Sequence, residues 1–250
     1  TDSDYSAFSE AEQSAIKRIW QRVAEDYAPF EIDVTTERPI SFNNRTAHVV
    51  ITRNTDANGI QNPSSSAGGV GYINVFGQPN YAFYRPVWVY INNLIFTESY
   101  IAEATSHEVG HNLGLSHDGK TDGTEYYSGH GFGSTSWGPI MGASYNRNVT
   151  QWSKGEYYLA NNTQDDLATI AARLGYRPDD HGDSSPLPRP CYSSAPTSSP
   201  PRRKLIRQTI TPPIKVFFNV IPMATSFISP LATVRCCWRL IPGSCRPARR

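Results

Sequence analysis

Apolar side chains recur at helical spacing in three parts of the chain. Between residues 9 and 27 they lie three or four positions apart, on one face of a helix that ends before Pro29: Ile16, Ile19, Trp20, Val23 and Tyr27. Ser9 and Glu12 have the spacing of a capping box at its start. A second helix is predicted from Thr97 to the histidines near residue 111. A third carries Leu167, Ile170, Ala171 and Leu174.

Short runs rich in β-branched residues predict strands at 31–36, 47–52 and 87–94. Alternation over 68–76 predicts a further strand, with one face made of Val70, Tyr72, Asn74 and Phe76. Residues 119–137 are rich in Gly, Ser, Thr and Tyr and have little periodicity, so they are predicted to form a loop.

The predicted second helix ends in a pattern that suits a metal ion, H-E-x-x-H-x-x-G-x-x-H, at residues 107–117. His107 and His111 are four residues apart and therefore lie on the same helix face, one turn apart. Gly114 can end the helix in a left-handed conformation, which turns the chain so that His117 can return as a third ligand. Three histidines leave the fourth position of a zinc ion open for water.

Glu108 follows the first histidine and can reach a water on that metal as its general base. A His-Glu-x-x-His segment alone can be ordinary helix surface, and a glycine near a helix end is usually only a cap. The glycine and the third histidine at the right spacing make chance agreement improbable. His130, between two glycines, is interpreted as a loop histidine.

The eleven residues resemble the zinc motif of the metzincin metalloproteases. Asp118 directly after the third histidine, and Asn112-Leu113-Gly114 within the motif, resemble most the reprolysin (adamalysin) branch. Residues 1–183 are acidic, free of cysteine and rich in Tyr, Asn and Gly, which favours a bacterial secreted form. Met141, in 138–142, resembles the structural Met-turn methionine beneath the zinc; without the resemblance it would be a core gap-filler. Where some branches carry a tyrosine ligand two residues later, this chain has Ala143.

The resemblance covers roughly residues 9–183. It implies an α/β (α+β) fold: a mixed, twisted sheet of about four or five strands with a backing helix, the zinc-binding helix and a C-terminal helical subdomain. It also implies that an extended substrate pairs with the edge strand, which is predicted to include Gly68, Gly69, Val70, Gly71 and Tyr72.

The implied function is that of a secreted zinc endopeptidase, a hydrolase in which His107, His111 and His117 hold Zn²⁺ and Glu108 is the general base. We expect a protein or peptide substrate, a monomer, and neither nucleic acid nor membrane as a partner. Calcium is common in the family, but no loop defines a site, and Asp56 with Asn58 is interpreted first as a solvated Asx turn.

Charge divides the chain in two. All 22 Asp and Glu and 12 of the 23 Lys and Arg lie in residues 1–183, whereas 184–250 contain 11 basic and no acidic residues. All four cysteines and 12 of the 19 prolines are also in this second part. We therefore predict a catalytic domain at 1–183 and a Pro/Arg-rich tail at 184–250. The tail is either disordered or translated out of frame, with a cationic linker as the alternative.

The family's helix at residues 9–27 normally follows a first sheet strand, and the few residues before Ser9 do not have a strand pattern. We therefore expect a sheet with four recognisable strands and no inhibitory propeptide or signal peptide in this sequence. Two other functions remain open: a metzincin-fold binding or adhesion module without catalysis, including a fragment that does not fold alone, and a zinc hydrolase that acts on other bonds. An intact Glu108 argues against a pure binding module.

Overall fold

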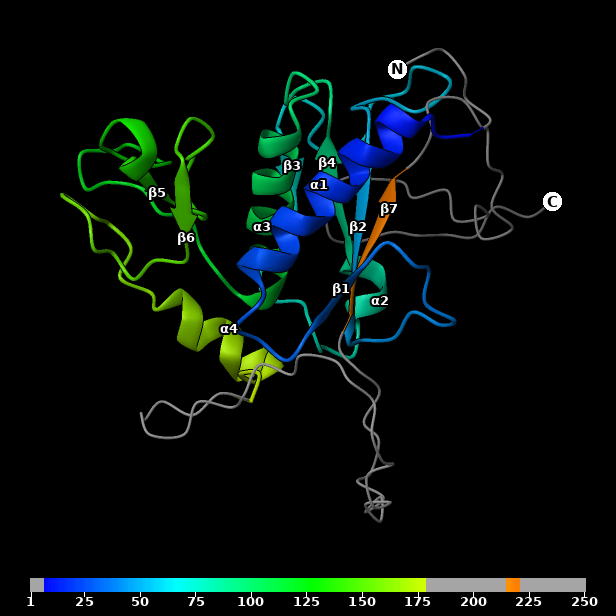
Figure 1. Ribbon diagram of the computed structural model, residues 1–250. Helices are drawn as coiled ribbons and strands as arrows, with labels where there is room; N and C mark the ends of the chain where they lie inside the picture. The colour runs from blue at the N-terminus through cyan, green and yellow to red at the C-terminus, as the bar shows by residue number, and fades with distance from the viewer. Residues whose placement is uncertain (1–6, 179–214, 221–250) are drawn as a thin grey trace, which may run out of the picture.

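The computed structural model describes residues 7–178 and 215–220. Its centre is a five-stranded mixed sheet in the order β1-β7-β2-β4-β3, and helices α1 and α3 lie side by side over one face (Figure 1). The strands are β1 (Asp33–Thr35), β2 (Thr46–Thr52), β3 (Gly69–Val70), β4 (Pro86–Tyr90) and β7 (Lys215–Val220). The first four strands in that order pair in parallel, and β3 runs antiparallel along β4, so the predicted fold class is confirmed.

Helix α3 (Glu98–Leu113) is the central helix of the domain. It packs against α1 (Glu10–Asp26) and against β2, β3 and β4. Every residue from 104 to 113 is buried, which is the property of a helix enclosed on all sides rather than of one with a single apolar stripe. The metal motif therefore lies on the most enclosed helix of the domain.

Two helix ends predicted from the sequence are present in the structure. Ser9 and Glu12 form the predicted capping box, and Gly114 ends α3 with a left-handed φ of 110°. Thr97 precedes α3, but its side chain caps no helical amide. Helix α4 (Asp166–Leu174) is capped by Asp165, which accepts from the Ala168 amide.

The predicted strand at 68–76 is too long, since only Gly69 and Val70 pair in the sheet. Beyond them the chain turns toward the end of α3, where the amides of Asn74 and Phe76 donate to the carbonyls of His111 and Asn112. Those carbonyls belong to the last turn of the helix and need outside donors. Capping α3 thus replaces continuation of the strand.

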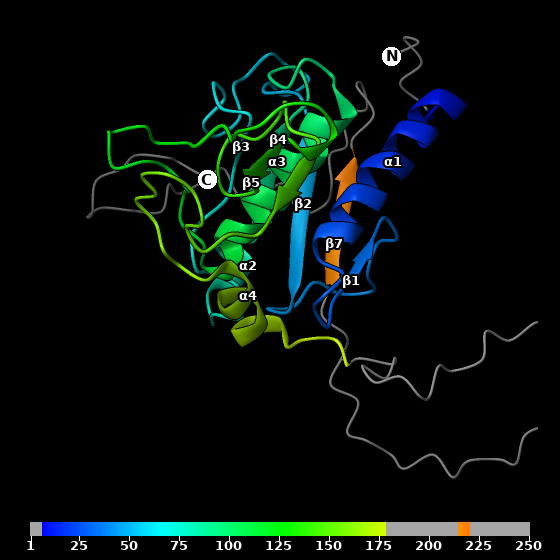
Figure 2. The same cartoon turned by 60° about the vertical axis from the view of Figure 1, so that its left-hand side comes forward.

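Residues 137–174 contain more than a helix. After β5 (Trp137–Pro139) and Met141, β6 (Val149–Gln151) pairs in parallel with β5 (Figure 1). Helix α4 follows them in the chain (Figure 2). The short elements α2 (Tyr81–Tyr84) and the 3₁₀ turn Gly133–Thr135 complete the described secondary structure. None of the helices in the described ranges is both long and apolar enough to cross a bilayer. Secretion and a monomeric state remain predictions.

The fifth strand of the sheet comes from residues predicted to belong to the tail. Strand β7 lies between β1 and β2 and pairs with both (Figure 1). The boundary at residue 183 stays a prediction, and the expectations for 1–6, 184–214 and 221–250 lie outside the described residues.

Candidate metal centre

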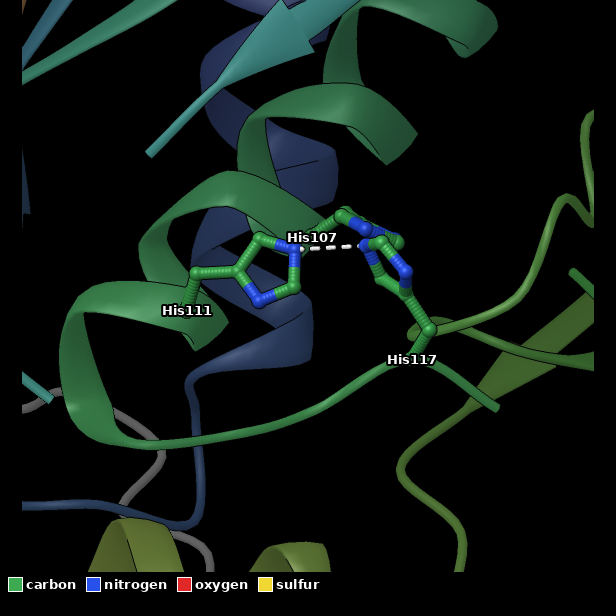
Figure 3. A group of neighbouring side chains, drawn as sticks. All are labelled: His107, His111 and His117. Carbon is green, nitrogen blue, oxygen red and sulfur yellow. Dashed lines mark hydrogen bonds between the residues drawn. The ribbon is translucent and has the colours of Figure 1, made fainter. Parts of the chain in front are cut away.

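The structure brings the three predicted histidines together. His107 and His111 project from consecutive turns of α3, and the left-handed turn at Gly114 returns the chain so that His117 faces them (Figure 3). One ring nitrogen from each lies within 4.8 Å of the others, and the Nε2 atoms of His111 and His117 are 3.0 Å apart. Two nitrogens that bind one tetrahedral zinc lie about 3.3 Å apart, so the cluster has suitable dimensions.

The far side of each ring is occupied by an acceptor. His107 Nδ1 donates to the Ile140 carbonyl at 2.9 Å, and His111 Nδ1 donates to the Leu115 carbonyl at 2.8 Å. His117 Nδ1 lies 3.4 Å from Glu125 Oε1. With these protons on Nδ1, the Nε2 lone pairs of His111 and His117 face each other without a proton between them. A cation between the two Nε2 atoms would remove the repulsion of their lone pairs. Hydrogen-bond acceptors on the Nδ1 side, as found here, are typical of metal-binding histidines.

Burial also keeps the rings neutral. It lowers the pKa of His107 to about 3, with His111 adding to the effect, and it lowers the pKa of His111 to about 4. The pKa of His117 is lowered by burial too, against the opposing charge of Glu125. Neutral imidazole is the form that binds a metal, so the site is ready for one at neutral pH.

Glu108 lies beside His107 in the same cleft. Burial raises the pKa of its carboxyl to about 8, and a backbone hydrogen bond from Gly71 opposes the rise. A nearby divalent cation favours the charged carboxylate and would lower this pKa again.

Strand β3 and the residue after it pass so close to Glu108 that only glycine fits at positions 69 and 71. A Cβ on Gly69 would lie 2.7 Å from Glu108 Cγ, and one on Gly71 would lie 2.5 Å from the Glu108 carbonyl oxygen. The sequence pattern did not indicate this role of the glycines, although their density there is a usable signal.

A Cβ on Gly69 would also lie 2.8 Å from the Trp88 carbonyl oxygen. Gly69→Ala should therefore displace the Glu108 side chain and reduce any turnover at this site by about 10²-fold, as expected for a misplacement near 1 Å. Zinc content should be unchanged, because the atoms nearest to a Cβ on Gly69 belong to Glu108 and Trp88 and not to a histidine. Gly68→Ala is the comparison variant, since its nearest neighbour is the flexible end of Leu94 at 3.0 Å and not Glu108. Because Gly68 also lines the cleft, the two variants are compared in kcat, which Gly68→Ala should keep within a few-fold of the parent. Steady-state kinetics with metal analysis decides this, and equal turnover in the two variants would contradict it.

Ile140 and Met141 contact the helix that carries His107 and His111. Met141 is fully buried, its sulfur leaves no room for a Cβ on Gly110, and its carbonyl accepts from the Asp118 amide. The preceding residue, Ile140, supplies the acceptor for His107. This placement agrees with a structural role for Met141.

A cleft of about 270 Å³ opens beside the histidines. Its lining residues are Ala67, Gly68, Gly69, His107, Glu108, Tyr126, Gly142, Ala143 and Tyr145. Of the five predicted substrate-binding residues, Gly68 and Gly69 line this cleft. The Tyr72 ring packs instead on Tyr84, and its carbonyl accepts from Asn112.

Sequence reasoning missed two loop residues of the site. Tyr126 packs on His117 with ring centroids 4.3 Å apart, and Glu125 contacts the same histidine. Both lie in the loop without periodicity, where no pattern distinguishes them. His130 bonds to the Tyr127 hydroxyl at 2.9 Å and does not belong to the cluster.

No calcium site is supported among the residues that the structure describes. Asp56 Oδ1 accepts from the amides of Asn58 and Ile60, both at 2.8 Å, which is the predicted Asx turn. Within the described ranges, the three histidines are the only group of three or more His, Cys, Asp or Glu side chains that converge on one point.

A comparison with protein-family models matches residues 4–153 to the reprolysin-type model of metallo-peptidase family M12. The matched region contains the whole histidine motif and Met141. No curated protein and no solved structure matches the chain.

Proposed function

This chain belongs to metallo-peptidase family M12, and on that premise we propose that it is a zinc-dependent endopeptidase. The observation that carries the proposal is the set of three neutral histidines, two of them buried and His117 half-buried, whose Nε2 atoms converge while their Nδ1 atoms have acceptors. The buried carboxyl of Glu108 beside them supplies the acid–base group that a metal-binding module does not need.

Zinc held by His107, His111 and His117 would supply a Lewis acid that polarises a substrate carbonyl and acidifies water. The histidines themselves do no proton transfer, because their Nδ1 protons are held by Ile140, Leu115 and Glu125. Their neutral state is maintained by burial, so the donor set does not change around pH 7.

Glu108 would move the proton. Its carboxylate takes a proton from the attacking water and passes it to the amine that leaves when the peptide bond breaks. Because Gly69 and Gly71 lack side chains, their backbone packs directly on the Cγ atom and the carbonyl group of Glu108. This close packing limits where the carboxylate can point.

The substrate would lie along β3. This strand is at the edge of the sheet and pairs with β4 on one side only, so its other side can pair with an extended peptide. The cleft between β3 and Tyr145 would then receive the side chain next to the cleaved bond.

Metal analysis and hydrolysis of an unfolded protein by the full chain test the proposal. We expect one zinc per chain and cleavage that a chelator abolishes, falling at least about 10³-fold because the metal supplies several kcal/mol of transition-state stabilisation. Added zinc should restore it. One zinc per chain without cleavage would contradict the proposal in favour of a binding module.

A further inference from the structure

A second cavity, of about 500 Å³, is lined by residues of α1, α3 and β6. Helices α1 and α3 pack side by side (Figure 1), and both contribute to its wall. The cavity shares no lining residue with the cleft beside the histidines. Its volume is within the usual range of small-molecule sites, roughly 300–1,000 Å³. It is therefore a separate candidate site, and the proposed hydrolysis does not use it.

Acidic side chains dominate the charge of this cavity. Its charged lining residues are Arg22, Glu25 and Asp26 from α1 and Glu103 from α3, and the other lining residues carry no charge. Among the residues that the structure describes, neither Asp26 nor Glu103 forms an ion pair. Negative charge is thus in excess in a partly enclosed space, which favours a cationic ligand.

Glu103 has a carboxyl oxygen without a hydrogen-bond partner. The side chain is deeply buried, and its Oε2 accepts from the Thr150 hydroxyl at 3.0 Å. Its Oε1 is enclosed by protein, and no donor in the described part of the chain reaches it. Protonation does not resolve this, because Oε1 would then be either a carbonyl without a donor or a hydroxyl without an acceptor. A donor group bound in the cavity would supply the missing partner.

Asp26 offers a second carboxyl at the end of α1. Its Oδ2 accepts from Ser106 Oγ at 2.5 Å, which ties the side chain to α3. A negative charge at this end of a helix is unfavourable, because the helix dipole is negative there. Burial raises the pKa of Asp26 to about 6 and that of Glu103 to about 8, and the charge of Asp26 adds to the rise at Glu103. A bound cation would stabilise both carboxylates.

We propose that this cavity binds a small organic cation, an aliphatic guanidinium, through Asp26 and Glu103. A guanidinium carries five donors in one plane and can therefore reach two carboxyls at once. Much of the remaining wall is apolar and suits an alkyl stem; its members are Pro29, Ala102, Ile140, Val149, Trp152 and Leu167. The indole of Trp152, whose Nε1 donates to the Asp26 carbonyl at 2.7 Å, adds an aromatic surface, which favours cations.

A metal ion fits this cavity less well than an organic cation. Calcium takes six to eight oxygen ligands. In the described ranges, however, no third His, Cys, Asp or Glu side chain converges with Asp26 and Glu103 on one point. The cavity also has many times the volume of a single ion or water molecule. The same volume admits a guanidinium group together with a short alkyl chain.

Calorimetric titration of the zinc-loaded full chain with n-butylguanidinium tests the proposal. We expect saturable binding of one ligand per chain, with a Kd of about 1 mM or lower. The neutral isostere n-butylurea should bind at least about 10-fold more weakly, because it has no charge to pair with a carboxylate. Equal binding of the two probes, or no saturable binding of n-butylguanidinium, would overturn the proposal.

Glu103→Gln and Glu10→Gln form a matched pair that locates the ligand. Each variant removes one negative charge, but Glu10 is exposed in the first turn of α1 and does not line the cavity. Glu103→Gln should weaken the binding of n-butylguanidinium at least about 10-fold, whereas Glu10→Gln should leave the Kd close to the parental value. If Glu103→Gln binds as the parent does, the ligand is held elsewhere and the proposal is wrong.

Hydrogen–deuterium exchange of the parent protein locates the ligand without any variant. n-Butylguanidinium should slow amide exchange in residues 99–103 and 148–152, which line the cavity, and n-butylurea should not. Slower exchange only around the histidine cleft would contradict the proposal. Displacement of the ligand by Ca²⁺ would show a metal site instead and would contradict it too. None of these measurements depends on turnover, so their outcome is separate from that of the proposed hydrolysis.

Discussion

Glu108→Gln is expected to retain one zinc per chain and to lower kcat by roughly 10³-fold, within the usual contribution of a general base. Glutamine keeps the shape of the side chain but cannot take up a proton. The three histidines keep their own Nδ1 acceptors, none of which is Glu108, so the metal site should not change. Single-turnover kinetics together with metal analysis measures both effects.

Glu103 offers a matched control on the same helix. Its carboxyl is also buried and its pKa is also raised to about 8, by burial and by the charge of Asp26. However, it accepts from Thr150 and lines a different pocket from that of Glu108. Glu103→Gln should therefore keep kcat within a few-fold of the parent. If both variants lose activity alike, the loss reflects damage to α3 and not the missing base; an active Glu108→Gln variant would remove the mechanism.

The metal site could be predicted from sequence because its geometry is local. The spacing of His107 and His111 depends only on helix periodicity, and the return of His117 depends on one turn at Gly114 with positive φ. Eleven consecutive residues thus contain most of the information, and the comparison with family M12 agrees with it.

Other parts of the site could not be predicted because they depend on contacts between distant segments. Glu125 and Tyr126 reach His117 from a loop whose path follows no hydrophobic period. The strand predicted at 68–76 ends at Val70 because capping α3 competes with sheet pairing, a contest that strand alternation does not reveal.

Strand β7 was even harder to predict from the sequence, because its place in the sheet depends on contacts with distant segments. Its apolar segment is visible in the sequence, but its partners are separated from it by more than 160 residues, and the change of charge at residue 183 suggested an unrelated tail. Neither composition nor periodicity can indicate which open edge a segment will fill. Only the gap between β1 and β2 identifies its position.

His111→Ala should have the largest effect on the metal itself. His111 supplies the nitrogen 3.0 Å from that of His117, and its removal leaves two ligands. Loss of an outer partner alone typically weakens metal binding by about 10- to 100-fold, so loss of a ligand should exceed 10²-fold and abolish measurable hydrolysis. Zinc titration measures the affinity. Thermal unfolding supports it, because zinc at about 100 times its Kd should stabilise the parent by roughly 2.7 kcal/mol and the variant far less.

His130→Ala is the matched control for this last experiment. His130 bonds to Tyr127 and lies outside the histidine cluster, so its loss should leave zinc affinity and turnover close to those of the parent. The comparison separates a specific ligand from a general contribution of histidine to metal binding. If His111→Ala still binds one zinc with parental affinity, the metal is held elsewhere, and the convergence of the three rings would then need another explanation. If only His111→Ala loses zinc and also loses the zinc-dependent rise in stability, the ion is bound at the end of α3 and contributes to the folded state.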